Sequence, residues 1–173
     1  MDLFEKYQTF IAGLIGFAGV MKTIKANSDQ NRAQLLEERK HESIALRRAL
    51  IEELKLVSNS YILNIEGLSN PRVYPIAYIP INPHIQAFKQ LLPQFGLLTV
   101  EEIEKTMLAY QLIQELPDKL GFLQTPDKSV HLENYIALDD SRCNDAAKIF
   151  DSMLNPVLQA IEILESHDTS NQS

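Results

Sequence analysis

Apolar residues dominate one stretch near the start of the chain, Tyr7 to Ile24, with the sequence YQTFIAGLIGFAGVMKTI. Its uninterrupted apolar-or-glycine run, from residue 10 to residue 21, covers 12 residues, and the whole stretch covers 18. A helix that crosses the hydrocarbon core of a bilayer, roughly 30 Å thick, needs about 17 to 25 residues. The pattern therefore predicts a short transmembrane helix, with residues 1–25 as the N-terminal tail and membrane anchor.

The residues at the two ends of this stretch favour insertion into a bilayer. Tyr7 is a residue type that suits the headgroup level. The stems of Lys22 and Lys25 can lie along the helix while their ammonium groups reach water. Thr23 can satisfy its hydroxyl by bonding back to the helix backbone. We therefore expect Tyr7, Lys22 and Lys25 at the membrane interface.

Three other interpretations of the stretch have to be weighed. A cleaved signal peptide has a basic start and a small-residue cleavage site, whereas this chain begins with Asp2 and Glu5 against Lys6 and has no such site. A helix buried in a protein core, apolar on all sides, has the same composition. A helix that lies flat in the interface has a charged face, and none divides this stretch.

Small residues recur inside the predicted span, at spacings that would permit pairing with another membrane helix. They are Ala12, Gly13, Gly16 and Gly19. Small side chains let two helix backbones approach closely in lipid, where no hydrophobic force drives association. The alternative is the ordinary abundance of Gly and Ala in membrane spans, and the sequence does not separate the two.

Basic residues on the two sides of the span predict its direction. Five follow it and one, Lys6, precedes it; the five are Lys22, Lys25, Arg32, Arg39 and Lys40. Because Lys and Arg accumulate on the cytoplasmic side, we expect the N-terminus outside and the bulk of the chain in the cytoplasm. The single cysteine, Cys143, agrees with a reducing compartment.

Beyond the span, the pattern predicts an all-α fold: a charged helical stalk, residues 26–45, and a helical-bundle domain, residues 46–166. No Pro or Gly occurs from residue 21 to residue 66, so the span is expected to continue into a long helix. An apolar stripe begins at Leu46, with the members Leu46, Leu50, Leu54, Val57, Tyr61 and Ile65. The opposite, solvent-facing side is expected to carry Arg47, Arg48, Glu52, Glu53 and Lys55.

About three further helices complete the predicted bundle. Residues 67–83 contain four prolines and predict an extended crossover, followed by a short helix at residues 84–92 with Asn82 as its cap. Thr99 and Glu102 form a capping box that starts the next helix, with the stripe Ile103, Met107, Tyr110, Ile113 and Leu116. The last helix begins near Asp140 and contains Pro156. Residues 167–173 predict a disordered tail.

Three tyrosines could line a groove for a partner: Tyr74, Tyr78 and Tyr110. The alternative is that the crossover simply packs on the bundle with its aromatic side chains inside.

Motifs for chemistry are weak in this sequence. The four histidines share no ligand spacing, and neither a nucleophile elbow nor a Gly-rich phosphate loop is present. Asp139, Asp140 and Asp145 form a carboxylate cluster, but acidic residues are common at a helix N-terminus. We therefore predict no catalytic, metal or cofactor site, and a protein that is not an enzyme.

The net charge of −7 is unevenly distributed along the chain. Residues 1–98 carry 11 Lys and Arg against 9 Asp and Glu, and residues 99–173 carry 5 against 14. The basic part suits an anionic membrane surface, whereas the acidic part offers no basic face for nucleic acid. The expected partners are thus the lipid bilayer and proteins.

Most of the chain resembles a group of bacterial inner-membrane proteins of unknown activity. The resemblance is carried by YQTFIAGLIGFAGV (residues 7–20), by EERKHE (residues 37–42), and by GLL-x-x-E-E-I (residues 96–103) leading to a helix with Tyr110. It implies one N-terminal span that runs into a cytoplasmic helix packed on a small helical domain in the bacterial inner membrane.

Two functions agree with this organisation. The first is a membrane-anchored interaction or scaffold protein that forms a homo-oligomer or binds a membrane or cytosolic protein partner. The alternative is a signal-responsive membrane effector, for example in host defence, that assembles through its span and perturbs the bilayer.

Overall fold

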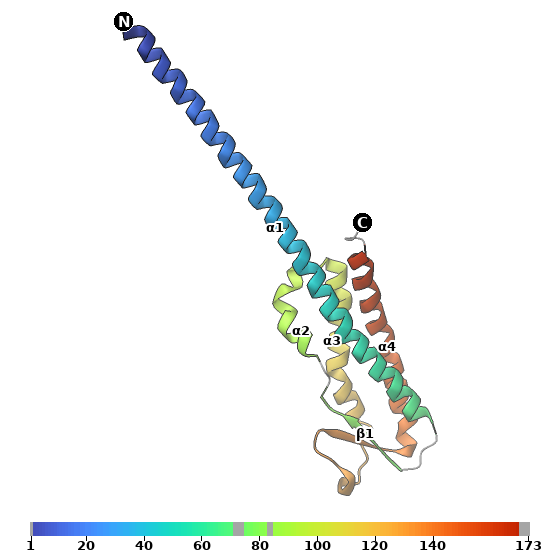
Figure 1. The fold of residues 1–173 in the computed structure, drawn as a ribbon. Coiled ribbons are helices and arrows are strands. Elements are labelled where there is room, and N and C mark those ends of the chain that lie inside the picture. Colours follow the sequence, from blue (N-terminus) through green and yellow to red (C-terminus); the bar gives the residue numbers. More distant parts are fainter. Residues whose placement is uncertain (1, 71–74, 83–84, 170–173) are drawn as a thin grey trace. The chain divides into compact units, whose positions relative to one another are not determined.

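The computed structural model describes residues 2–70, 75–82 and 85–169, and the side chains within the helices from Phe17 onward, except those of residues 18, 168 and 169. These residues form four α-helices: α1 (Asp2–Ser69), α2 (Gln86–Leu91), α3 (Val100–Gly121) and α4 (Asp140–Thr169) (Figure 1). Two short strands are β1 (Ile76–Pro80) and β2 (Tyr135–Asp139). Short 3-10 helices lie at Leu92–Leu97 and Lys128–Val130. The chain divides into two compact units, residues 1–42 and residues 43–173.

The second unit is a helical bundle, as predicted. Its core is formed by the last part of α1 with α3 and α4, which run side by side in Figure 1. The predicted stripe on α1 is confirmed: its buried members are Leu46, Leu50, Leu54, Val57 and Tyr61. The core side chains of α4 repeat at helical spacing and include Phe150, Met153, Val157 and Leu164.

The first unit contains the part of α1 that precedes residue 43. From Gly19 to Glu42 every residue is exposed. The predicted stalk, residues 26–45, is helical throughout, and the boundary between the two units lies inside it.

A two-stranded antiparallel sheet, absent from the all-α prediction, lies beside the helices. Ile76 of β1 pairs with Asp139 of β2, and Pro80 pairs with Tyr135. The sequence predicts extended chain where β1 lies, within residues 67–83, but not its pairing with β2, because local patterns carry no information on partners this far apart. Pro80 is tolerated because it occupies the end of an edge strand.

The start of α2 differs from the prediction. The helix begins at Gln86 with Ile85 as its N-cap, and no side chain of its own segment caps it. Instead, the Glu53 carboxylate of α1 accepts the amide hydrogens of Ala87 and Phe88 at 2.7 and 2.9 Å. A carboxylate from another helix thus takes the role expected of Asn82.

The capping box that starts α3 is confirmed. The Thr99 hydroxyl accepts from the Glu102 amide, and the Glu102 carboxylate accepts from the Thr99 amide at 2.7 Å. The predicted apolar stripe is wrong at Met107, which is 41% exposed, whereas the neighbouring Thr106 is buried.

The predicted disordered tail, residues 167–173, is wrong at its start. Helix α4 continues through His167 to Thr169, and residues 170–173 lie outside the described residues. The last turn brings the His167 ring to a buried carboxylate of α3, a contact that the local sequence does not reveal. Pro156 lies inside α4, as expected.

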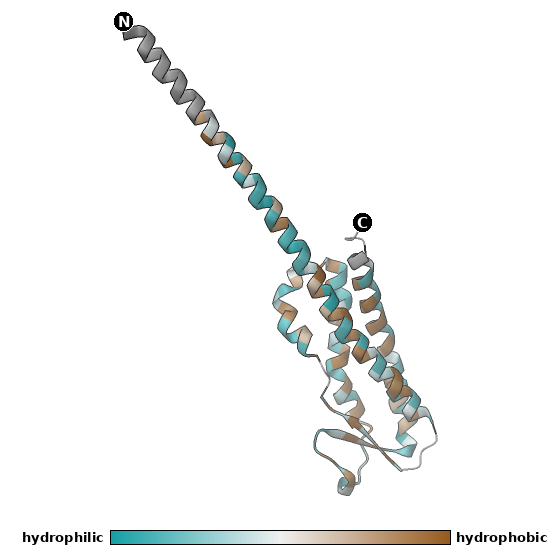
Figure 2. Cartoon of the chain, viewed as in Figure 1, coloured by the Kyte–Doolittle hydropathy of each residue, from teal (hydrophilic) through white to brown (hydrophobic). Residues whose placement is uncertain are grey.

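Figure 2 shows how hydropathy varies along the chain. Among the residues that the structure describes with their side chains, no helix is apolar enough over a sufficient length to cross a membrane. The side chains of residues 7–16 and 18, most of the predicted span Tyr7 to Ile24, lie outside that set. The transmembrane helix therefore stays a prediction.

Candidate functional site

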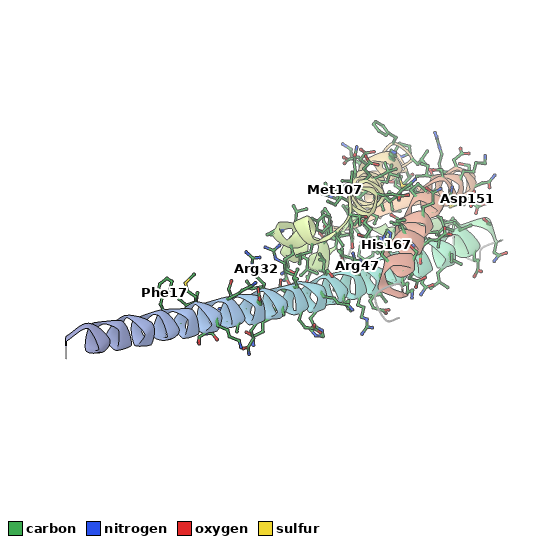
Figure 3. The ribbon with its side chains drawn as sticks, turned by 90° about the horizontal axis from the view of Figure 1, so that it is seen from above. Phe17, Arg32, Arg47, Met107, Asp151 and His167 are labelled. Carbon is green, nitrogen blue, oxygen red and sulfur yellow. The ribbon has the colours of Figure 1, made fainter. Side chains whose placement is uncertain are left out.

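An exposed apolar face lies on α1 at the end of the predicted span. Phe17, Val20, Met21 and Ile24 are 65%, 56%, 52% and 58% exposed. Their spacing of three, one and three residues places them on one side of the helix, and Figure 3 shows Phe17 projecting from it. We call these four residues the apolar face of α1. A helix turns by about 100° per residue, which places Lys22 on the opposite side.

The other predicted membrane residues divide into two groups. Gly19, Lys22 and Lys25 are exposed, and a Cβ atom added at Gly19 would meet nothing within 4 Å. The Thr23 hydroxyl donates to the carbonyl of Gly19 at 3.0 Å, which confirms the predicted bond back to the helix backbone. The side chains of the remaining residues, Tyr7, Ala12, Gly13 and Gly16, lie outside the described residues.

A buried ionic cluster joins three helices at the end of the bundle where α3 begins (Figure 3). Arg47 of α1 donates from Nε to Oε1 of Glu102 at 2.6 Å and from Nη2 to Oε2 at 3.1 Å. Nδ1 of His167, on α4, lies 3.2 Å from Oε1 of the same carboxylate. Arg47 also donates to the Ser43 hydroxyl at 3.2 Å. We call the ion pair of Arg47 and Glu102, together with the neighbouring His167 ring, the ionic cluster.

The surroundings of Glu102 keep it ionised. Burial alone would raise its pKa, but hydrogen bonds from Arg47 and Thr99 outweigh burial and hold the pKa below the ordinary value. Both carboxylate oxygens already accept hydrogen bonds, so Glu102 is engaged in holding the helices together and is not a free base.

The sequence predicts Arg47 on the solvent side of its helix, and this is wrong. Arg47 lies beside the apolar stripe, and the carboxylate of Glu102 draws it into the bundle, where it is only 5% exposed. Local periodicity cannot report a partner 55 residues away. A capping-box glutamate followed by an apolar stripe was the one signal that pointed towards this site.

A second polar group, the half-buried carboxylate of Glu53, links α1 to α2 and α3. Besides the two α2 amides, Glu53 accepts the hydroxyl hydrogen of Tyr110 at 2.8 Å. The Tyr110 ring stacks on Phe88 with 4.0 Å between ring centroids. Burial, followed by the hydrogen bond to Glu53, raises the pKa of Tyr110 far above its ordinary value, so the hydroxyl stays a donor.

The predicted tyrosine groove is not assembled from the described tyrosines. Tyr110 is fully buried, whereas Tyr78 is 42% exposed on β1, donates to the carbonyl of Val130 and packs against Tyr135. Tyr74 lies outside the described residues. The structure thus places Tyr78 and Tyr110 in different surroundings.

The acidic cluster at the start of α4 is involved in local contacts. Asp140 lies in the first turn of the helix, and Asp145 pairs with Lys148 at 3.1 Å. Within the described residues, no group of three His, Cys, Asp or Glu side chains is arranged to hold a metal ion.

Fold and site together define a helical bundle with a small antiparallel sheet, internal ionic contacts and an apolar face on α1. Comparison with models of protein families, with curated proteins and with solved structures found no match for the chain. The resemblance to bacterial inner-membrane proteins therefore stays a prediction.

Proposed function

We propose that the protein is a membrane-attached interaction protein without enzymatic activity. In this proposal, residues 7–24 of α1 enter the lipid bilayer, and the bundle of residues 43–169 binds a protein partner or a second copy of the chain. The observation that carries it is the exposure of the apolar face of α1, Phe17, Val20, Met21 and Ile24. Exposed apolar side chains gathered on one surface are typical of contact with lipid or protein.

Lipid is the occupant that we propose for this face, because apolar sequence and basic residues occur together there. The apolar run from residue 10 to residue 21 continues into the face, and Lys22 and Lys25 follow at a depth that suits phosphate headgroups. With more basic residues after the span than before it, the proposed location is the bacterial inner membrane, with the bundle in the cytoplasm.

An interaction role is favoured over catalysis by the way the buried ionisable groups are engaged. Glu102 is bonded by Arg47 and Thr99, and Glu53 is bonded by Tyr110 and two backbone amides. These contacts stabilise the bundle, and they occupy the groups that an active site would use.

Chemical crosslinking in native membranes tests the interaction role. The full-length chain, crosslinked and then purified under denaturing conditions, is expected to carry a second copy or one recurring protein partner. The Gly19→Leu variant distinguishes the two arrangements, because it should weaken a contact made through the helix in the membrane and leave one made through the bundle unchanged.

Recovery of monomer alone, across crosslinkers of different reach, would contradict the interaction role. A collapse of membrane potential on expression, measured with a voltage-sensitive dye, would instead support the alternative of a membrane effector.

A further inference from the structure

A cavity of about 400 Å³ lies in the bundle, between α1, β1, α3 and α4, and its described lining includes no residue of the two polar groups above. Its lining is apolar and includes Val57, Ile79, Ile113, Leu116 and Phe150. None of the described residues that line it is charged, although 23% of the chain is. Small-molecule sites in proteins have volumes of about 300 to 1,000 Å³ and are mostly apolar.

Tyr61 lines the cavity and carries a hydroxyl that has no hydrogen-bond partner among the described residues. The side chain lines the cavity, is 4% exposed, and meets Phe150 edge-on with 5.2 Å between ring centroids. Its hydroxyl is buried and has no hydrogen-bond partner among the described residues. Leaving a buried hydroxyl unsatisfied is costly, so this group favours a ligand that can accept its hydrogen.

The hydroxyl of Tyr61 is a donor at every physiological pH. Burial raises the pKa of Tyr61 well above its ordinary value, so the group does not ionise. It would therefore complement an acceptor such as a carbonyl oxygen. An anionic ligand would lose hydration without gaining a cation, because no described Lys, Arg or His lines the cavity.

Uncharged polar residues also line the cavity. Ser60 and Asn82 are exposed, and the Asn64 amide donates to the carbonyl of Ser60 at 2.8 Å. The cavity thus combines an apolar interior with a polar, uncharged rim.

We propose that this cavity binds an uncharged, mainly aliphatic small molecule that accepts a hydrogen bond from the Tyr61 hydroxyl. The proposal is independent of membrane attachment, since every residue that it uses belongs to the bundle.

Binding of three related probes to the full-length chain is measured by methyl-detected NMR titration, with the same detergent throughout. Methyl octanoate carries the acceptor, nonane lacks it, and octanoate carries a negative charge. Methyl octanoate is expected to bind most tightly. Tyr61→Phe should weaken its binding by about three- to tenfold, the net value of one neutral hydrogen bond, and leave nonane binding unchanged.

Two further variants separate the cavity from the rest of the surface. Ser60→Trp places a large ring at the exposed rim and should reduce binding of methyl octanoate and nonane alike. Tyr78→Phe removes a tyrosine hydroxyl that does not line the cavity and should change neither.

The proposal is overturned by any of three results. These are no saturable binding of methyl octanoate, equal affinity of the original chain and Tyr61→Phe for it, and tighter binding of octanoate than of its methyl ester. A cavity that holds only water would give the first of these results.

Discussion

At the scale of single residues, Glu102 does two things with one carboxylate. It closes the capping box of α3 through Thr99, and it pairs with Arg47 of α1. Because Glu102 and Arg47 are both buried, loss of one leaves the other charge without compensation in the interior. The ionic cluster therefore stabilises the packing of α1 against α3.

Replacement of Glu102 by Gln should destabilise the bundle by about 3 to 5 kcal/mol at neutral pH, the usual cost of breaking a buried ion pair. The pKa of Glu102 is lower in the folded chain than its ordinary value of 4.5. Its stabilisation is therefore present above that value and is lost as pH falls through the lower, folded pKa. Urea unfolding followed by circular dichroism should show the two chains converging in stability as the medium is acidified.

Glu104→Gln is the matched control for this experiment, since Glu104 is an exposed carboxylate on the same helix. It should change stability by less than about 0.5 kcal/mol, as surface substitutions usually do. If Glu102→Gln behaved like this control at every pH, the ionic cluster would not have the role assigned to it.

Residue roles were the least predictable part of the molecule. The capping box could be read from Thr99 and Glu102 because both partners lie in one short segment. The contacts of Arg47 and Glu53 could not be predicted, because their partners are distant in the sequence. Arg47 pairs with Glu102, 55 residues away, and Glu53 pairs with Tyr110, 57 residues away. The Tyr61 hydroxyl, which has no partner among the described residues, also could not be predicted, because Tyr61 belongs to the predicted apolar stripe.

At the scale of elements, the periodicity of apolar residues predicted the long helices but did not predict the two strands. The stripe on α1 is continuous for several turns, so its buried face could be predicted. β1 and β2 have five residues each, and their pairing depends on contacts across the sequence. The short helix α2 is also defined by tertiary contact, since Glu53 caps it from another element.

Substitutions at Glu53 and Tyr110 should show that one carboxylate holds α2 in place. Tyr110→Phe removes one hydrogen bond to a charged group and should cost about 1.5 to 3 kcal/mol. Glu53→Ala should cost more, because it also uncaps α2 and leaves the Tyr110 hydroxyl buried without an acceptor. Thermal unfolding gives both values, and hydrogen exchange should show faster exchange at the amides of Ala87 and Phe88 in Glu53→Ala alone.

The neighbouring Glu52→Ala serves as the control, because Glu52 is exposed on the same helix. Equal effects of the substitutions at residues 52 and 53 would show that the contacts of Glu53 do not stabilise α2. The effects of Glu53→Ala and Tyr110→Phe should not add in the double variant, because the two side chains share one interaction.

At the scale of the whole molecule, both the division into compact units and the balance of charge differ between the N-terminal and C-terminal parts of the chain. Residues 1–42 form one compact unit and residues 43–173 another, close to the predicted boundary between stalk and bundle. Charge changes as well, from a small excess of basic residues before residue 99 to a large acidic excess after it. Residues 1–42 carry six Lys and Arg against six Asp and Glu, so the proposed contact with a bilayer rests on the apolar face of α1 and on the positions of Lys22 and Lys25, and not on net charge.

Alkaline carbonate extraction of native membranes tests the attachment to a bilayer most directly. The full-length chain should stay in the membrane pellet after extraction. A variant with Phe17, Val20, Met21 and Ile24 changed to Gln should move to the supernatant, because polar side chains remove the apolar contact with lipid. The control changes Leu35 and Leu36 to Gln; both are exposed apolar residues of the stalk, and this chain should stay in the pellet.

Circular dichroism of the purified variants checks that the bundle remains folded in each of them, so that release from the membrane is not caused by unfolding. The predicted result is release of the four-residue variant alone. Release of the unchanged chain by carbonate, or retention of the four-residue variant together with the control, would contradict membrane attachment through this face of α1.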